Sequence, residues 1–282
     1  MKEGNSISNQ LLTKDIFVAT EYAKLIQSRP GFITMVAPMY AASLIDSHRG
    51  RVFRYMYISA RHIDDLVDGD KESIGDPIEA VRRYQKVILH GRRIDLDDKY
   101  EEIMLYGIRE TAKLGDGRDD VKGDFFRLTN AILFDHERSK NRSILTKNEL
   151  DGYYENLLGP SLNIGLICAG SKFRGADFPE MIYGQGRLYS VRDLKKDLRR
   201  GLCNIPLEVL EAAGVTKAAT IQEILETQAV RAWVRKELGY GKVETQRLKE
   251  RLKTCDGGAK LICTIPLIGM ERIIKTKQRK DS

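Results

Sequence analysis

Residues 52–68 read Val-Phe-Arg-Tyr-Met-Tyr-Ile-Ser-Ala-Arg-His-Ile-Asp-Asp-Leu-Val-Asp, an apolar and aromatic stretch that ends in acidic residues. Its apolar positions recur at intervals of three and four, which predicts one buried helix running to Gly69. Asp64 and Asp68 are four residues apart, so their carboxylates share one face of that helix. Two like charges at this spacing repel each other, and an apolar helix also partly desolvates them. We therefore expect a cation between the two carboxylates.

We expect this cation to be a hard metal ion, which prefers oxygen ligands. Carboxylates without histidine or cysteine partners favour Mg²⁺, with Mn²⁺ as an alternative, and Mg²⁺ usually shares its coordination shell with water and substrate phosphates. For a single motif of this kind, a solvated helix end is the competing interpretation, because charge clusters commonly mark exposed faces.

A second pair with the same spacing follows later in the chain. Residues 191–201 read Val-Arg-Asp-Leu-Lys-Lys-Asp-Leu-Arg-Arg-Gly and place Asp193 and Asp197 on a predicted helix. Taken alone, this stretch is also compatible with an exposed helix, since Asp193 with Lys196 and Asp197 with Arg200 are spaced as ion pairs. Together, the two motifs can face each other across a helical cavity, where they would hold several Mg²⁺ ions beside a diphosphate.

The two motifs, at 61–69 and 192–201, resemble the aspartate-rich motifs of the squalene/phytoene synthase family in order, separation and flanking arginines. Residues 40–43, Tyr-Ala-Ala-Ser, resemble the early aromatic-small-serine stretch of that family. Tyr153-Tyr154, followed by Gly159, resembles its central tyrosine-rich helix. The resemblance covers roughly residues 30 to 215, and the last quarter of the chain matches by helical character only.

The resemblance implies an all-α, isoprenoid-synthase-like helical bundle around a central cavity. It also implies a transferase that joins two prenyl diphosphates, farnesyl or geranylgeranyl diphosphate, head to head (1'-1) through a cyclopropyl intermediate to a phytoene-like or (dehydro)squalene-like hydrocarbon. The need for a reductant stays open.

The chemistry assigns roles to named side chains. The carboxylates that would hold the metal are Asp64, Asp68, Asp193 and Asp197. Asp65 would assist without direct coordination, because one helical step turns it about 100° away from Asp64. Cationic and hydroxyl groups are candidates for contact with the diphosphate: Arg61, Arg192, Arg199, Arg200, Ser43 and Arg49. By resemblance, Tyr153 lies beside the reacting carbons, where it would stabilise a carbocation or handle a proton, and Tyr40 and Tyr189 are candidates for the cavity lining.

The sequence departs from the family pattern in two places. Gly186 and Tyr189 stand where the family commonly has Gln and Asn, and residues 201–206, Gly-Leu-Cys-Asn-Ile-Pro, replace the usual Gly-Arg-Ile-Tyr-Leu-Pro. These changes bear on the product more than on the metal chemistry. Two alternatives therefore remain: a phytoene-synthase-like class I terpene synthase that cyclises a single prenyl diphosphate, and a non-catalytic family member.

Length and composition predict one substantial domain over residues 1–282, with frayed tails at 1–8 and 276–282. Helical periodicity and capping signals predict helices at 9–28, 77–89, 97–114, 119–136, 146–169, 218–238 and 242–254, and few stretches alternate as a strand would. Asp76 with Pro77, and a capping box from Thr146 to Glu149, mark two of the starts. A polar loop is expected at 46–51, and Pro38 is expected to kink or start a helix. The chain is therefore expected to be nearly all α-helix.

The charge distribution and the absence of targeting signals limit the classes of binding partner and the cellular location that we expect. The net charge of +7 is spread along the chain, without the aromatic-interleaved basic stripe of a nucleic-acid surface. Four cysteines without a CxxC pair, and no apolar run long enough for a signal or a membrane span, predict a cytoplasmic protein. Residues 261–270 are apolar and precede a basic tail, so they form either a final core helix or a peripheral contact with a membrane. The oligomeric state stays open.

Overall fold

The computed structural model describes residues 2–33, 36, 39, 40, 43, 46–71, 75–215 and 219–281, and the side chains of 9–277 within those ranges. The elements assigned there are all helices, and Ile144 and Cys203 form an isolated parallel bridge. The prediction of an all-α fold is confirmed. Pro38, which was expected to kink or start a helix, lies outside the described residues.

The chain divides into two compact units, and neither is a continuous stretch of sequence. Unit 1 comprises Met1–Thr129 and Asn163–Gly170, and unit 2 comprises Asn130–Leu162 and Ser171–Ser282. Two helices, α6 (Val121–Asn141) and α7 (Lys147–Cys168), therefore contribute residues to both units. The expectation of a single domain stays a prediction.

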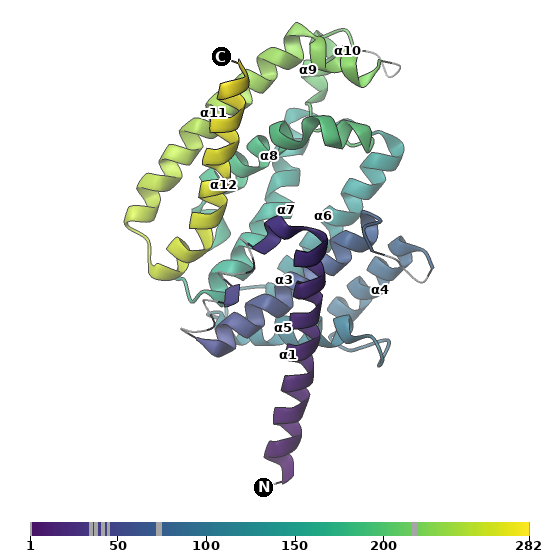
Figure 1. Ribbon diagram of the computed structural model, residues 1–282, viewed down its shortest axis with the longest axis vertical. Helices are drawn as coiled ribbons and strands as arrows, with labels where there is room; N and C mark the ends of the chain where they lie inside the picture. Colours follow the sequence, from purple (N-terminus) through teal and green to yellow (C-terminus); the bar gives the residue numbers. More distant parts are fainter. Residues whose placement is uncertain are drawn as a thin grey trace. The chain divides into compact units, whose positions relative to one another are not determined.

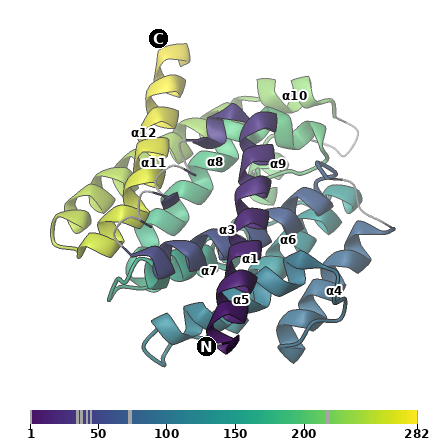
Figure 2. The same cartoon turned by 60° about the horizontal axis from the view of Figure 1, so that its bottom comes forward.

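Unit 1 is built around α3, which carries the first aspartate motif. Helix α3 packs against three other helices of the unit (Figures 1 and 2). The main helices of this unit are α1 (Lys2–Ser28), α3 (Ser47–Val67), α4 (Pro77–His90) and α5 (Lys99–Leu114), and η1 (Pro30–Phe32) is a short 3₁₀ turn. Part of its apolar core comes from α1, α3 and α5 and includes Val18, Tyr22, Tyr55, Ile58 and Ile103.

Unit 2 is built around α8, which carries the second motif. Helices α8 (Pro179–Arg199), α11 (Gln228–Lys253) and α12 (Gly257–Asp281) pack against one another side by side (Figure 1). A Cβ atom added at Gly241 would come within 2.5 Å of the Leu188 side chain, so glycine there allows α11 to approach α8 closely. The shorter elements are η2 (Gly175–Asp177), α9 (Leu207–Ala212) and α10 (Ile221–Glu226).

Helix boundaries follow capping chemistry, and the start of α3 was predicted wrongly. The Asp76 cap of α4 is confirmed, since its carboxylate accepts a hydrogen bond from the Ile78 amide. The polar stretch 46–51 was expected to be a loop. Instead α3 begins at Ser47, because Asp46 accepts hydrogen bonds from the amides of the first turn and nucleates the helix there.

The C-terminal helices also differ from the prediction. One helix, α11, runs through the break that was expected between residues 238 and 242, because Gly241 packs against α8 and does not end the helix. Helix α12 reaches Asp281 and α1 begins at Lys2, and the fraying of the two tails stays a prediction.

Within the described ranges, no helix combines the length and apolar character required to cross a membrane. Residues 261–270 were expected to form either a core helix or a contact with a membrane. They lie on α12, where the side chains of Leu261 and Ile268 are exposed. A peripheral membrane contact stays a prediction.

Candidate active site

The first motif forms its own ion-pair network at the end of α3. Arg61 donates to the carboxylates of both Asp64 and Asp65, one turn ahead of it. Asp65 also lies 3.6 Å from Arg29, so two arginines surround it and 17% of its side chain is exposed. The Asp64 side chain is 37% exposed. Because Asp68 is the C-cap of the same helix, Asp64 and Asp68 remain on one face, as the spacing predicts.

A second charged cluster joins α1 and α5 beside the first motif. The Glu21 carboxylate accepts hydrogen bonds from Lys24 and Lys71, each at 2.8 Å, and from the Tyr100 hydroxyl. Burial alone would raise the pKa of Glu21, but these three donors outweigh it and lower the pKa to about 2. The ionised carboxylate is therefore a stabilising element of unit 1.

This cluster predicts a pH-dependent stability. The folded pKa of Glu21 lies below the unfolded value near 4.5, so its contribution is complete above that value and is lost as pH falls toward 2. We expect Glu21→Gln to lower the free energy of unfolding by about 2 kcal/mol at pH 7 and by progressively less from pH 5 to pH 3. Urea denaturation across this range measures the difference, and a difference that does not change with pH would contradict the argument.

Tyr40 and Ser43, from the Tyr-Ala-Ala-Ser stretch, both contact the side chain of Arg54 on α3. The Arg54 guanidinium lies 4.4 Å from the centroid of the Tyr40 ring and also donates to the Ser43 hydroxyl. Ser43 in turn donates to the Met39 carbonyl at 3.1 Å. The structure thus brings the two predicted residues together, and it adds Arg54, which the sequence analysis did not assign to the site.

Arg49 makes contacts within unit 1 that hold the start of α3. Its guanidinium donates to the Ile167 carbonyl at 2.9 Å and lies 3.3 Å from the Asp46 carboxylate. Its expected contact with a diphosphate stays a prediction.

The second motif lies on α8 in unit 2. Arg192 donates to Asp193 and stacks 4.0 Å from the centroid of the Tyr189 ring, so these three residues form one group. Asp197 accepts a 3.4 Å hydrogen bond from the Asn204 amide. Arg199, the last residue of α8, is exposed, as is Arg200, its C-cap.

The charge around Asp197 fits a divalent cation. Burial, followed by the negative charges of Asp193 and Asp135, raises the pKa of Asp197 to about 6, against the opposing effect of Lys196 and Arg200. Carboxylates that disfavour one another's ionisation are stabilised by a bound cation. Within the described ranges no three acidic, histidine or cysteine side chains form a complete metal site. The binding of Mg²⁺ by these carboxylates stays a prediction.

Asp135 and Arg138 on α6 belong to the same neighbourhood. The Tyr153 hydroxyl donates to Asp135, and burial followed by that carboxylate raises the pKa of Tyr153 well above its usual value. Arg138 is almost fully buried and lies 3.2 Å from Asp135. It also donates to the Cys203 carbonyl at 2.8 Å and to the Asn204 side chain at 3.0 Å. Tyr153 is therefore a neutral phenol held within a polar cluster.

Sequence reasoning missed both α6 residues. The helix was expected to end at His136, which left Arg138 outside it, whereas α6 continues to Asn141. The available signal was the three-residue spacing of Asp135 and Arg138, a common helical ion pair. Asn204 was noticed only as a departure from the family pattern.

The predicted site residues fall into two groups. Unit 1 holds the first motif with Tyr40, Ser43 and Arg49, and unit 2 holds the second motif with Tyr153 and Tyr189. That the two motifs face each other stays a prediction.

Comparison with known proteins places the chain in a family. The family model for squalene/phytoene synthase matches residues 39–282. The chain belongs to the squalene/phytoene synthase family. Enzymes of the squalene/phytoene synthase family are transferases of the prenyltransferase type and generally depend on a divalent metal.

The fold agrees with this assignment. The structure is similar to a crystal structure of a dehydrosqualene synthase in complex with ligand, at 14% sequence identity and a TM-score of 0.61. The similarity covers 91% of this chain and 86% of that one. The isoprenoid-synthase-like fold expected from the sequence is thereby confirmed, while the central cavity stays a prediction. A search of curated proteins gave no match.

Proposed function

We propose that this member of the squalene/phytoene synthase family condenses two molecules of farnesyl or geranylgeranyl diphosphate head to head, with Mg²⁺, to a phytoene-like or (dehydro)squalene-like hydrocarbon. The observation that carries the proposal is the pair of four-spaced aspartate motifs on α3 and α8, each bound to its own arginine. A chain of this family with both motifs has the groups needed to bind metal and diphosphate.

Each group of residues has a separate role in the proposed reaction. Asp64 and Asp68 on one helix, and Asp193 and Asp197 on the other, would hold Mg²⁺, which supplies positive charge to the departing diphosphate. Arg61 and Arg192 already lie beside these carboxylates, where guanidinium groups can bind phosphate oxygens.

Tyr153 suits the stabilisation of a carbocation. Its ring face provides negative electrostatic potential. Its raised pKa and its hydrogen bond to Asp135 keep the phenol protonated, so it is a poor nucleophile toward the cation. A site that forms a carbocation requires such a side chain, because a reactive oxygen would trap the cation.

Cyclisation of a single prenyl diphosphate is the second candidate. It is favoured by the loop that follows the second motif, where Asn204 replaces the tyrosine usual in the family. The Asn204 amide contacts both Arg138 and Asp197. The tyrosine hydroxyl is therefore missing from a place next to the metal-binding residue Asp197.

The test is the carbon number of the product. Purified protein is incubated with Mg²⁺ and either farnesyl or geranylgeranyl diphosphate, and the extracted hydrocarbon is analysed by mass spectrometry. We expect a product with twice the carbons of the substrate. A product with the substrate's carbon number would establish the cyclase. Binding of a diphosphate analogue that depends on Mg²⁺ and is lost in Asp64→Ala would support either enzyme, whereas its absence would favour the non-catalytic alternative.

A further inference from the structure

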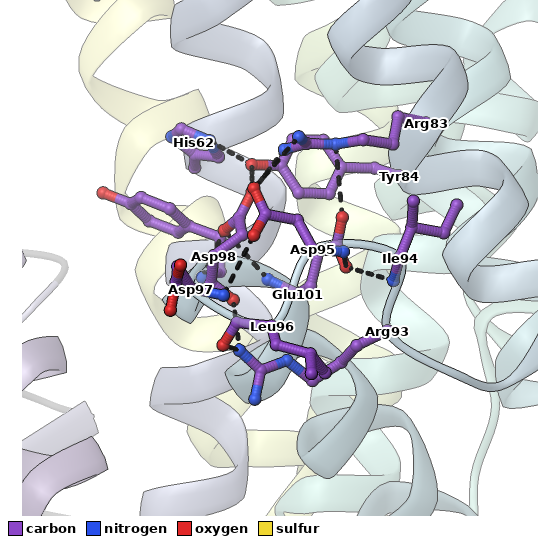
Figure 3. Close-up of polar contacts among 11 residues, drawn as sticks. His62, Arg83, Tyr84, Arg93, Ile94, Asp95, Leu96, Asp97, Asp98 and Glu101 are labelled. Atoms are coloured by element: carbon purple, nitrogen blue, oxygen red, sulfur yellow. Dashed lines mark hydrogen bonds and ion pairs between the residues drawn. The ribbon is translucent and has the colours of Figure 1, made fainter.

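His62 lies in the first motif between Arg61 and Asp64, and it is more buried than the side chains of both. The residue is 8% exposed and packs among residues of α4 and α5 (Figure 3). Its ring stacks on Tyr100, with the centroids 3.5 Å apart and the planes 3° from parallel. The Tyr84 ring meets it edge-on at 5.5 Å. Two aromatic rings thus fix the orientation of the imidazole.

A hydrogen-bond chain leads from His62 to the start of α5. The Tyr84 hydroxyl donates to the Asp98 carboxylate at 2.8 Å and lies 2.9 Å from the Nε2 atom of His62 (Figure 3). A phenol has one proton, and Tyr84 gives it to Asp98. Nε2 must therefore carry the hydrogen and donate it to the Tyr84 oxygen. This defines the Nε2–H tautomer of His62.

The imidazole forms its hydrogen bond through a single nitrogen. Within the described part of the chain, the buried Nδ1 atom has no hydrogen-bond partner. The contact with Tyr84 is therefore the polar anchor of the ring.

Asp98, at the far end of this chain, is itself rigidly held. Its carboxylate caps α5 by accepting hydrogen bonds from the amides of Tyr100 and Glu101 at 2.8 and 3.2 Å. The fully buried Glu101 accepts hydrogen bonds from the amides of Ile94 and Asp95 at 2.7 and 2.9 Å, which fixes the segment leading into the helix (Figure 3). The capped start of α5 is a fixed support for His62.

We propose that His62 is a positioning residue for the first aspartate motif. By donating from Nε2 to Tyr84, it fixes the rotation of the last turns of α3 and hence the direction of the Asp64 and Asp68 carboxylates. This inference rests on the proposed function, in which those carboxylates hold the metal. The role does not require His62 to touch the metal or the substrate.

Two substitutions at His62 separate the hydrogen bond from the aromatic stacking. Both His62→Gln and His62→Asn remove the ring. The amide nitrogen of Gln reaches the place of Nε2 and can still donate to Tyr84, whereas that of Asn is one bond too short. Tyr84→Phe removes the acceptor and keeps both rings, so it provides the test even where a change at position 62 prevents folding.

The first readout is binding of a non-hydrolysable farnesyl diphosphate analogue by calorimetry, with and without Mg²⁺. Loss of a residue that orients a metal ligand typically weakens binding by about ten-fold or more, which is expected for His62→Asn and Tyr84→Phe. His62→Gln should bind within about three-fold of the wild type, because it keeps the orienting donor. Equal weakening by Gln and Asn, or unchanged binding in Tyr84→Phe, would overturn the proposal.

Two further readouts need no ligand. Amide hydrogen exchange over residues 60–68 should be faster in His62→Asn than in His62→Gln, and equal rates would overturn the positioning role. Nitrogen NMR of the wild type at pH 7 should show His62 with its proton on Nε2, and a proton on Nδ1 would equally overturn it. If the wild type does not bind the analogue with Mg²⁺, the proposed function fails, and these two measurements decide the positioning role alone.

Discussion

Asp64→Asn is expected to lower kcat/KM with prenyl diphosphate and Mg²⁺ by on the order of 10²–10³, the loss typical when one group that stabilises developing charge is removed. Asp64 shares a helix face with Asp68, and its side chain is the more exposed of the two carboxylates bound to Arg61. Steady-state kinetics over a range of Mg²⁺ concentrations measures the loss, which should appear with a raised Mg²⁺ requirement.

The neighbouring carboxylate provides the matched control. Asp65 is engaged by Arg61 and lies near Arg29, so Asp65→Asn should disturb this ion-pair network and lower kcat/KM by about ten-fold, the lower end of the loss expected for a residue that acts through another. The melting temperature of each variant shows whether it is folded. Equal losses at the two positions would contradict the assignment of Asp64 as a direct metal ligand.

Arg138→Met is expected to destabilise the protein by about 3 kcal/mol, because removing one partner of a buried ion pair leaves the other charge uncompensated. The substitution removes the ion pair with Asp135 and leaves the Cys203 carbonyl and the Asn204 side chain without their buried donor. Urea denaturation followed by circular dichroism measures the change in the free energy of unfolding.

The control for Arg138 is an arginine whose ion pair is exposed on both sides. Arg82 pairs with Glu79 at 2.8 Å with the same three-residue spacing, and the two side chains are 54% and 63% exposed. Arg82→Met should therefore cost less than about 1 kcal/mol. Similar losses in the two variants would show that burial of the Arg138 network does not determine its contribution.

Features that depend on local chemistry were predicted well. The Asp76-Pro77 start of α4 was confirmed, and Glu149 of the Thr146 capping box accepts hydrogen bonds from the Thr146 amide and hydroxyl. Both aspartate motifs lie on helices, as their apolar periodicity indicated. Such signals act within one or two turns and are visible in a single sequence.

Features that depend on contacts between distant residues were not predicted. The partners of Arg138 lie 65 and 66 residues away, and no spacing rule connects α6 with the loop after α8. The sequence analysis gave His62 no role, because the hydrogen-bond chain through Tyr84 to Asp98 forms only when α4 and α5 pack against α3. The continuity of α11 through 238–242 was missed for the same reason, since Leu188, which packs against Gly241, is remote in sequence.

The division of α6 and α7 between the two compact units has a consequence for the inheritance of this chain. The polypeptide passes from one unit to the other at 129/130, 162/163 and 170/171, the first two of which lie inside helices. A single recombination event at 129/130 would join segments of two parents within unit 1, one at 170/171 would do so within unit 2, and one at 162/163 would do so within both units. All three points lie between the two aspartate motifs, so we expect the motifs to be inherited together, with changes in one motif selected against the background of the other.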